Sequence, residues 1–116
     1  MTAETKRVAL AWERGLIFRG GSPGGPESVI DGDNAAGPGP MATLLLAAAA
    51  CSGSDVVAIL GKMRVVLREL RIEVRGLRRE QEPKRYTSIQ FHFHIAGDGL
   101  DETRARRAID LSLEKY

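Results

Sequence analysis

The sequence predicts an α+β fold built on antiparallel hairpins, and three observations support this prediction. Apolar and polar residues alternate in the segments 7–12, 70–75 and 87–95, as they do in strands with one buried face. A long apolar segment over 41–63 predicts a helix between these strands. A second helix is expected from Asp101 onward. Strands, a long helix, two more strands and a final helix, in that order, are typical of the α+β class.

The composition indicates one ordinary globular domain. The chain has 116 residues, of which 43% are hydrophobic and 28% are charged, and this balance argues against disorder. A chain of this length can bury a modest core, so we expect residues 1–116 to form a single domain. Lysines and arginines number 17 against 15 acidic residues, a net charge of +2. That excess is too small to indicate nucleic-acid binding.

The N-terminal part of the sequence predicts a small antiparallel sheet. Alternation in the segment 7–12 places three apolar side chains on one half-buried face: Val8, Leu10 and Trp12. Gly15 then precedes a short apolar run at 16–18, which indicates a hairpin. Residues 15–40 hold 8 of the 13 glycines and 4 of the 5 prolines. We therefore expect mostly turns and loops there, with one further short strand at 28–30.

The central apolar segment predicts a buried helix from about Met41 to Met63. Pro40 suits the first turn of a helix. The polar stretch 52–55 either caps a second helix that begins at Val56 or lies within one long helix. A helix that is apolar on all sides is buried on most of them. Because a thin monomer cannot cover such a helix, we infer a homodimer.

Neither a membrane span nor a secretion signal is expected. The stretch from Met41 to Leu60 is as long as a bilayer requires, but polar residues such as Ser52 and Asp55 interrupt it. A carboxylate at the centre of a bilayer is costly. The N-terminus leads into alternating residues and not into the apolar run of a signal peptide. We therefore expect a cytoplasmic protein.

The C-terminal half predicts a hairpin followed by a helix. Apolar residues at 70, 72 and 74 alternate with charged residues, and a second alternating strand over 87–95 follows a polar turn that contains Pro83. Gly97-Asp-Gly99 ends that strand. Asp101 is a suitable N-cap for a helix that runs to Tyr116.

The single cysteine, Cys51, is the strongest candidate for chemistry, and a single thiol excludes a disulfide within this sequence. One interpretation is inert packing, because free cysteine is among the most buried residue types. The other is a reactive thiolate, which needs a cation or a helix N-terminus to lower the thiol pKa from about 8.5. A helix that restarts at 52–55 would place its positive end beside Cys51. The carboxylate of Asp55 opposes a second negative charge there, and we interpret Asp55 as a helix cap.

Two arginines that flank the first hairpin, Arg14 and Arg19, can supply the cation that a thiolate needs. The alternative for each is a solvated surface arginine. Sequence spacing places neither of them near Cys51.

Two further polar features are interpreted as solvated surface. His92 and His94 project from one side of the last strand, but no third ligand at suitable spacing accompanies them, so no metal site is expected. Residues 64–85 hold eight Arg or Lys against four Glu. Positive and negative residues are interleaved there, which is typical of the solvent-exposed face of a hairpin. Gly61-Lys62-Met63 lacks the Ser or Thr of a phosphate-binding loop.

Several motifs spread over nearly the whole chain point to one family. They are Asp31-Gly-Asp33, Gly37-Pro-Gly-Pro-Met41, Leu44-Leu-Leu, Ala-Ala-Cys51-Ser-Gly-Ser-Asp-Val-Val-Ala-Ile-Leu60, Arg85-Tyr-Thr, Phe-His-Phe-His, Gly97-Asp-Gly-Leu-Asp101 and Ala108-Ile-Asp-Leu-Ser-Leu-Glu-Lys-Tyr116. Together they resemble the OsmC/Ohr family, the osmotically inducible and organic hydroperoxide resistance proteins. The cysteine-bearing helix is a fairly specific part of this resemblance.

The resemblance implies an intertwined homodimer, with two central helices between mixed sheets and a site at the subunit interface. Characterised members are thiol-dependent peroxidases that reduce organic hydroperoxides or hydrogen peroxide, and Cys51 matches their first cysteine. Its thiolate would attack the peroxide O–O bond and become a sulfenic acid. A second cysteine would then form a disulfide, which an external dithiol such as a lipoylated protein reduces. An arginine from the N-terminal hairpin supplies the charge, with Arg19 the first match and Arg14 the second. No cofactor, metal, nucleic acid or membrane is expected as a partner.

The sequence departs from the family's pattern in two places. The second cysteine is expected directly after Glu114-Lys-Tyr116, where the sequence stops, so we expect the C-terminal part to be missing. A glutamate that helps to orient the arginine is expected near the start of the helix, where the sequence reads Pro40-Met-Ala-Thr43. A second function therefore stays open: a non-catalytic dimer of the same fold that binds a small lipophilic molecule at the subunit interface.

Overall fold

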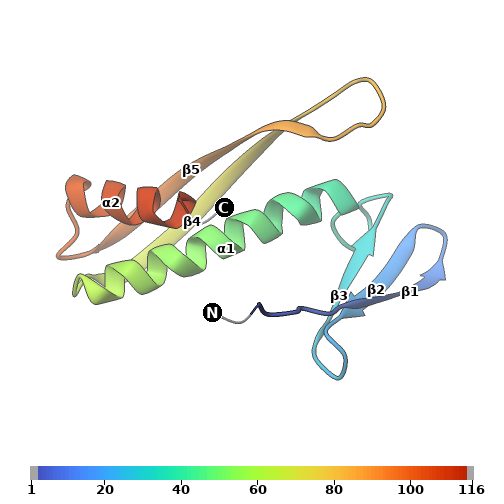
Figure 1. Ribbon diagram of the computed structural model, residues 1–116, viewed down its shortest axis with the longest axis horizontal. Helices are drawn as coiled ribbons and strands as arrows, with labels where there is room; N and C mark the ends of the chain where they lie inside the picture. Colours follow the sequence, from blue (N-terminus) through green and yellow to red (C-terminus); the bar gives the residue numbers. More distant parts are fainter. Residues whose placement is uncertain (1–2, 115–116) are drawn as a thin grey trace. The chain divides into compact units, whose positions relative to one another are not determined.

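The computed structural model describes residues 3–114, which form two compact units, one up to Leu44 and one from Leu45. The first unit contains a three-stranded antiparallel sheet (Figure 1). Its strands are β1 (Ala9–Arg14), β2 (Ile17–Gly21) and β3 (Glu27–Asp31), in that order across the sheet. The strands predicted at 7–12, 16–18 and 28–30 are thus confirmed, with small shifts at their ends.

The hairpin between β1 and β2 turns at Gly15, whose φ of 52° is in the left-handed region that favours glycine. The indole N–H of Trp12 donates to the Gly15 carbonyl at 2.9 Å. Trp12 pairs with Phe18 and Arg14 with Ile17, so Glu13 is the extra residue of a β-bulge.

The prediction that β1 has a half-buried apolar face is wrong for this unit. Every residue of β1 is exposed, and Trp12 is 65% exposed. The physical reason is that no second layer covers the strand within its own unit. No hydrophobic residue among residues 3–44 is buried.

The predicted central helix is one continuous element, α1 (Pro40–Lys62). It does not restart at 52–55, so Asp55 lies inside the helix and the interpretation of Asp55 as a cap is wrong. The helix is followed by Arg64, which has a left-handed φ of 62°. Burial follows one stripe at helical spacing: Ala49, Ser52, Gly53, Val56 and Leu60. Much of the remaining surface of α1 is exposed within the described chain, as expected if one chain cannot cover the helix, and its burial in a dimer stays a prediction.

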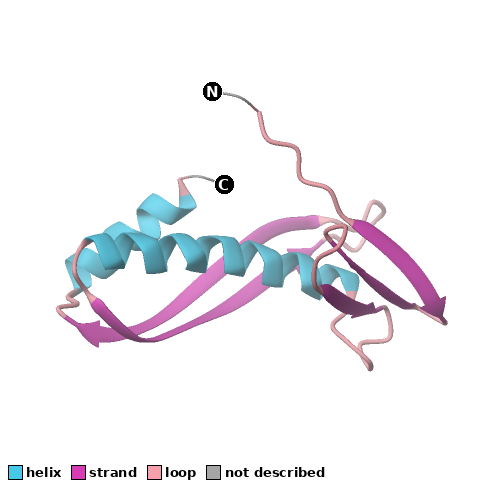
Figure 2. Ribbon diagram, turned by 90° about the horizontal axis from the view of Figure 1, so that it is seen from below, coloured by secondary structure: helices cyan, strands magenta, loops and turns pink. Residues whose placement is uncertain are grey.

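The second unit packs helices on one face of a long hairpin (Figure 2). The hairpin pairs β4 (Val66–Arg78) with β5 (Tyr86–Asp98), and α2 (Glu102–Leu113) follows it. The buried core consists of Val56, Leu60, Val65 and Ala108, with the inward residues of both strands packed around them. The sheet and both helices therefore share one small core.

The start of α2 is confirmed as predicted. The Asp101 side chain accepts a hydrogen bond from the Arg104 backbone N–H at 2.8 Å, the geometry of an N-cap. The helix ends at Leu113. The predicted extension to Tyr116 lies outside the described residues.

One helix among residues 3–114, α1, is long and apolar enough to cross a membrane by length and composition, with a mean hydropathy of 1.9. The core helix of a soluble protein meets the same criterion. Here the buried stripe of α1 packs on the β4–β5 hairpin: a Cβ added at Gly53 would lie 3.0 Å from Cδ1 of Ile72. This contact packs one face of α1 against the sheet.

Candidate functional site

Cys51 lies in the interior of α1, about three turns after its first residue. The hypothesis of a helix N-terminus beside the thiol is therefore wrong, because the helix is continuous through 52–55. Inert packing predicts an enclosed sulfur, but the Cys51 side chain is exposed in the described chain. The thiol is thus accessible from the side of α1 that faces away from the sheet.

The helix surface around Cys51 combines small apolar side chains with two polar ones, the exposed Ser54 and the half-buried Asp55 one turn further on. Leu44, two turns earlier on the same face, is exposed, and Ala47 and Ala58 are exposed too. Alanine side chains leave room for another chain or a small molecule to come close to the sulfur. The surface therefore offers an exposed thiol with alanines on one side and a carboxylate one turn away.

The two candidate arginines are brought together by a carboxylate that the sequence reasoning missed. Glu13 forms an ion pair with each arginine: its Oε1 atom accepts from Nε of Arg19, and its Oε2 atom lies 3.5 Å from Nη1 of Arg14. The acidic residue stands between the arginines in sequence. The β-bulge places Glu13 against both arginines. The alternation of apolar and polar residues gives no signal for such a bulge.

Asp31 is a second charged residue that the sequence reasoning did not single out as a site. Its side chain is only 2% exposed and accepts backbone N–H groups from Asp33 at 2.9 Å, Ala35 at 3.2 Å and Ala36 at 2.9 Å. Hydrogen bonds from Ala36 and Asp33 lower the pKa of Asp31 below its ordinary value, and the charge of Arg14 adds to this. Asp31 thereby organises the loop that leads from β3 to α1.

Cys51 belongs to the unit from Leu45 onward, and the arginines belong to the unit up to Leu44. The structure thus brings Arg14 and Arg19 together, each in contact with Glu13. The pairing of either arginine with Cys51 stays a prediction.

The two histidines lie on one side of β5 as predicted; His92 is exposed, whereas His94 is half-buried and its Nε2 atom is shielded from solvent without a hydrogen-bond partner among the described residues. The rings of His92 and His94 are 4.5 Å apart between centroids, and Nε2 of His94 lies 3.8 Å from a carboxylate oxygen of Glu73. Across residues 3–114, no group of three or more His, Cys, Asp or Glu side chains is arranged to hold a metal ion. Nearby arginines pair with acids, as Arg71 does with Glu69 at 2.8 Å.

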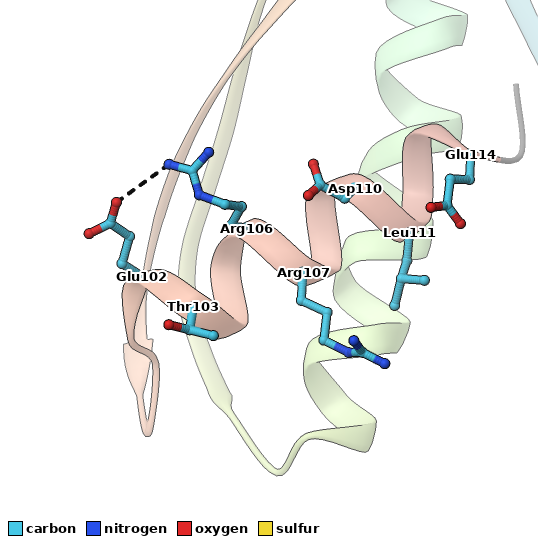
Figure 3. A pocket seen from close by; sticks show the side chains of 7 residues that line it. All are labelled: Glu102, Thr103, Arg106, Arg107, Asp110, Leu111 and Glu114. Carbon is cyan, nitrogen blue, oxygen red and sulfur yellow. Dashed lines mark hydrogen bonds and ion pairs between the residues drawn. The ribbon is translucent and has the colours of Figure 1, made fainter.

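A hollow on the outer face of α2 is lined by this helix and its C-cap only (Figure 3): Glu102, Thr103, Arg106, Arg107, Asp110, Leu111 and Glu114. Its charges have both signs, and Glu102 pairs with Arg106 at 3.4 Å. Such a surface is typical of a solvated helix face. None of its residues is a candidate from the sequence.

The comparison with known families identifies the fold class. Residues 31–116 match the family described as OsmC-like protein. Because this match covers more than half of the chain, the protein belongs to the OsmC-like family. The prediction of this family and of an α+β fold is confirmed.

Individual relatives agree with this assignment. YhfA of Escherichia coli K12 is 40% identical over 111 residues, which are 95% of this chain and 83% of YhfA. The crystal structure of a protein from Aquifex aeolicus VF5 is similar with a TM-score of 0.85 and 33% identity, over 98% of this chain and 83% of that one. The organic hydroperoxide resistance protein OhrB of Bacillus subtilis shares the fold with a TM-score of 0.59 and 19% identity, over 97% and 85% of the chains.

Proposed function

We propose that this protein is a thiol-dependent peroxidase that reduces organic hydroperoxides or hydrogen peroxide through Cys51. The observation that carries the proposal is that the one thiol of the sequence is exposed on the central helix of an OsmC-family chain. A protein named for organic hydroperoxide resistance shares this fold, which agrees with the proposal. Arg19 is the proposed partner of the thiolate, with Arg14 as the second choice.

The proposed reaction begins with the Cys51 thiolate. Its sulfur attacks one oxygen of the peroxide, the O–O bond breaks, and the second oxygen leaves as an alkoxide or hydroxide that takes up a proton. The products are a sulfenic acid on Cys51 and an alcohol or water. A guanidinium near the sulfur favours the thiolate and stabilises the negative charge that develops on the leaving oxygen.

An external dithiol completes the proposed cycle, as a lipoylated protein would. Its first thiol condenses with the sulfenic acid to a mixed disulfide and releases water. The second thiol of the same reductant then attacks this mixed disulfide and displaces the Cys51 thiolate. The reductant is released as a disulfide. We place this reaction in a cytoplasmic homodimer that acts on small peroxides, without a cofactor and without nucleic-acid or membrane partners.

Peroxide consumption tests the proposal. Purified protein with dithiothreitol should consume cumene hydroperoxide, and Cys51→Ser should abolish this. Ser54→Ala is the matched control, because Ser54 is exposed on the same helix and its hydroxyl donates to the Ala50 carbonyl at 2.8 Å. Unchanged consumption by Cys51→Ser would remove the proposal.

The alternative function is a non-catalytic dimer that binds a small lipophilic molecule. The exposed apolar side chains of α1, Leu44, Leu46 and Val57, favour it. This function predicts no peroxide consumption. It also predicts a rise in melting temperature with a lipophilic probe such as a medium-chain fatty acid, and that rise would persist in Cys51→Ser.

A further inference from the structure

The two histidines of the chain, His92 and His94, lie on the face of the β4–β5 hairpin opposite the helices. Both helices of this unit pack on the other face (Figure 2), where Phe93 and Ile95 of β5 contact the core. Residues two apart on a strand point to the same side, so the two imidazole rings are neighbours, with 4.5 Å between their centroids. The paired strands thus hold two nitrogen ligands next to each other.

The Nε2 atom of His94 is buried and lacks a hydrogen-bond partner. Among the side-chain nitrogens and oxygens of residues 3–114, it is the one atom in this state. A carboxylate oxygen of Glu73 lies 3.8 Å away, which is too long for a hydrogen bond. Because a buried polar atom without a partner is costly, an ion between the ring and the carboxylate would supply the partner that the chain lacks.

Glu73 supplies the third ligand that sequence spacing does not offer. It pairs directly with His92 across the two strands, which places it diagonal to His94. Zinc binds imidazole nitrogen at about 2.0–2.1 Å and carboxylate oxygen at about 2.0–2.2 Å, so two ligand atoms that share one ion lie about 3–4 Å apart. The 3.8 Å between Nε2 of His94 and Oε2 of Glu73 falls within this range.

We propose that His92, His94 and Glu73 bind a divalent transition-metal ion of the zinc type on this face of the hairpin. Two imidazoles and one carboxylate are a ligand set that zinc takes where a fourth position stays open to water. As described, the three side chains are not gathered around one point. His92 is exposed and the Glu73 side chain is 69% exposed, so both can turn toward the half-buried ring of His94 when an ion binds. The proposal is independent of the chemistry proposed for Cys51.

The positive charges around the site set limits on its affinity. Arg71 faces His94 across the strands, but it is paired with Glu69 at 2.8 Å. Arg75 and His92 both line a hollow of about 500 Å³ beside the site. This hollow has room for the water molecules that complete the coordination of the ion, whereas the charge of Arg75 opposes a cation. Arg75→Gln should therefore tighten metal binding.

A zinc titration of the full chain, purified without an affinity tag, tests the site. The Cys51→Ser variant is the background, because an exposed thiol also binds zinc. Isothermal titration calorimetry with zinc chloride at neutral pH should show one ion bound per chain. Loss of a group that only orients a metal ligand costs about 10–100-fold in affinity, so loss of a ligand itself in His92→Gln or His94→Gln should cost at least about tenfold.

The carboxylate ligand has a matched control in the same hairpin. Glu73→Gln should weaken zinc binding by about tenfold. Glu80→Gln removes the same charge from an exposed position in the turn and should leave the affinity unchanged. Equal effects of the two changes would mean that only the net charge matters and would overturn the role of Glu73.

Nuclear magnetic resonance identifies the ligands without any histidine substitution. His92 and His94 give all the imidazole signals of the chain, and zinc should shift the ring nitrogens of both in Cys51→Ser protein. This readout holds even where a histidine variant does not fold. Zinc that binds without shifting these signals occupies another place and would overturn the proposal. The absence of saturable binding at millimolar zinc would overturn it too, and neither result depends on peroxide reactivity.

Discussion

Asp31 is a carboxylate with almost no access to water, and the backbone around it explains how it stays charged. Three N–H groups of the loop that follows β3 point at its two oxygens. Its own N–H donates to the Pro38 carbonyl at 3.0 Å, which closes the loop just before α1. One residue thus links the sheet of the first unit to the start of the cysteine-bearing helix.

The substitution Asp31→Asn should make the protein less stable at neutral pH and remove part of the acid sensitivity of folding. The folded-state pKa of Asp31 is below its ordinary value of 3.8. Its stabilisation is therefore present above that value and is lost as the pH falls through the folded-state pKa. The free energy of unfolding, measured by urea titration from pH 7 down to pH 2, should fall more steeply for the wild type than for Asp31→Asn. Asp33→Asn keeps the backbone N–H that Asp31 needs and should behave like the wild type; a parallel pH dependence in Asp31→Asn would contradict this role.

A buried pair of hydroxyls joins the two helices next to Cys51. Ser52 and Ser112 are fully buried, and their oxygens are 2.9 Å apart. Ser112 donates its one hydrogen to the Ile109 carbonyl at 2.7 Å, so Ser52 is the donor between the two serines. The residue that follows Cys51 is thereby tied to α2.

Removal of the Ser112 hydroxyl should cost about 1–3 kcal/mol of stability, because Ser52 loses its acceptor in a buried place. Ser52→Ala should cost less, since Ser112 keeps its bond to Ile109. Chemical denaturation of the two variants checks this order. A larger loss in Ser52→Ala would mean that the donor assignment is wrong.

At the scale of elements, the close contact between the hairpin and α1 depends on a glycine. A Cβ at Gly76 would lie 2.4 Å from Cε1 of Tyr86 and 3.0 Å from Cδ2 of Leu45. The Tyr86 ring of β5 therefore lies over Gly76 of β4 and close to α1. No other residue type fits there without movement of the ring.

Alanine at position 76 should destabilise the protein by about 1–3 kcal/mol, the usual cost of overpacking. The matched change is Gly61→Ala in the last turns of α1, where a Cβ meets no atom within 4 Å. That variant should gain about 0.5–1 kcal/mol from helix propensity. Opposite signs of the two changes in unfolding free energy are the expected result, and a neutral Gly76→Ala would contradict the close packing.

The elements that obey a regular period could be predicted from the sequence, and the irregular ones could not. Alternation located Leu70, Ile72 and Val74 on the inner face of β4 correctly. The strand begins at Val66, four residues before the predicted segment 70–75. Its first residues do not follow the alternation because Arg68 forms a bulge, so that Leu67 and Leu70 share a face although they are three residues apart. A prediction that relies on strict alternation of apolar and polar residues misses the part of the strand that lies before such a bulge.

The same limit explains the candidate site. Residue type and family resemblance were enough to single out Cys51, Arg14 and Arg19. Glu13 was not predicted as a site residue because its contact with both arginines depends on a bulge. The role of the Asp31 charge was not predicted because its partners are backbone N–H groups of a loop. Both depend on backbone geometry that residue patterns do not encode.

At the scale of the whole molecule, too much apolar surface is left uncovered for one chain. Leu46 of α1 is 58% exposed, and Leu10 and Trp12 of β1 are exposed as well. Apolar surface in this quantity is typical of an interface. A second copy of the chain is the proposed cover.

The homodimer predicts a sedimentation mass of two chains in analytical ultracentrifugation. Leu46→Asp should shift the protein toward one chain, because a buried unpaired carboxylate at an interface is costly. Lys84→Glu in the turn of the β4–β5 hairpin changes charge outside the apolar surface and should leave the mass at two chains. Sedimentation of the wild type as a single chain at micromolar concentration would contradict the dimer.

The most direct test of the peroxidase function is the oxidation state of Cys51 itself. Protein treated with an equimolar amount of cumene hydroperoxide in the presence of dimedone, a trap for sulfenic acids, is digested and measured by mass spectrometry. The predicted result is a dimedone adduct on the peptide that contains Cys51, formed while the hydroperoxide becomes its alcohol. An unmodified Cys51 thiol alongside unconsumed hydroperoxide would contradict the account.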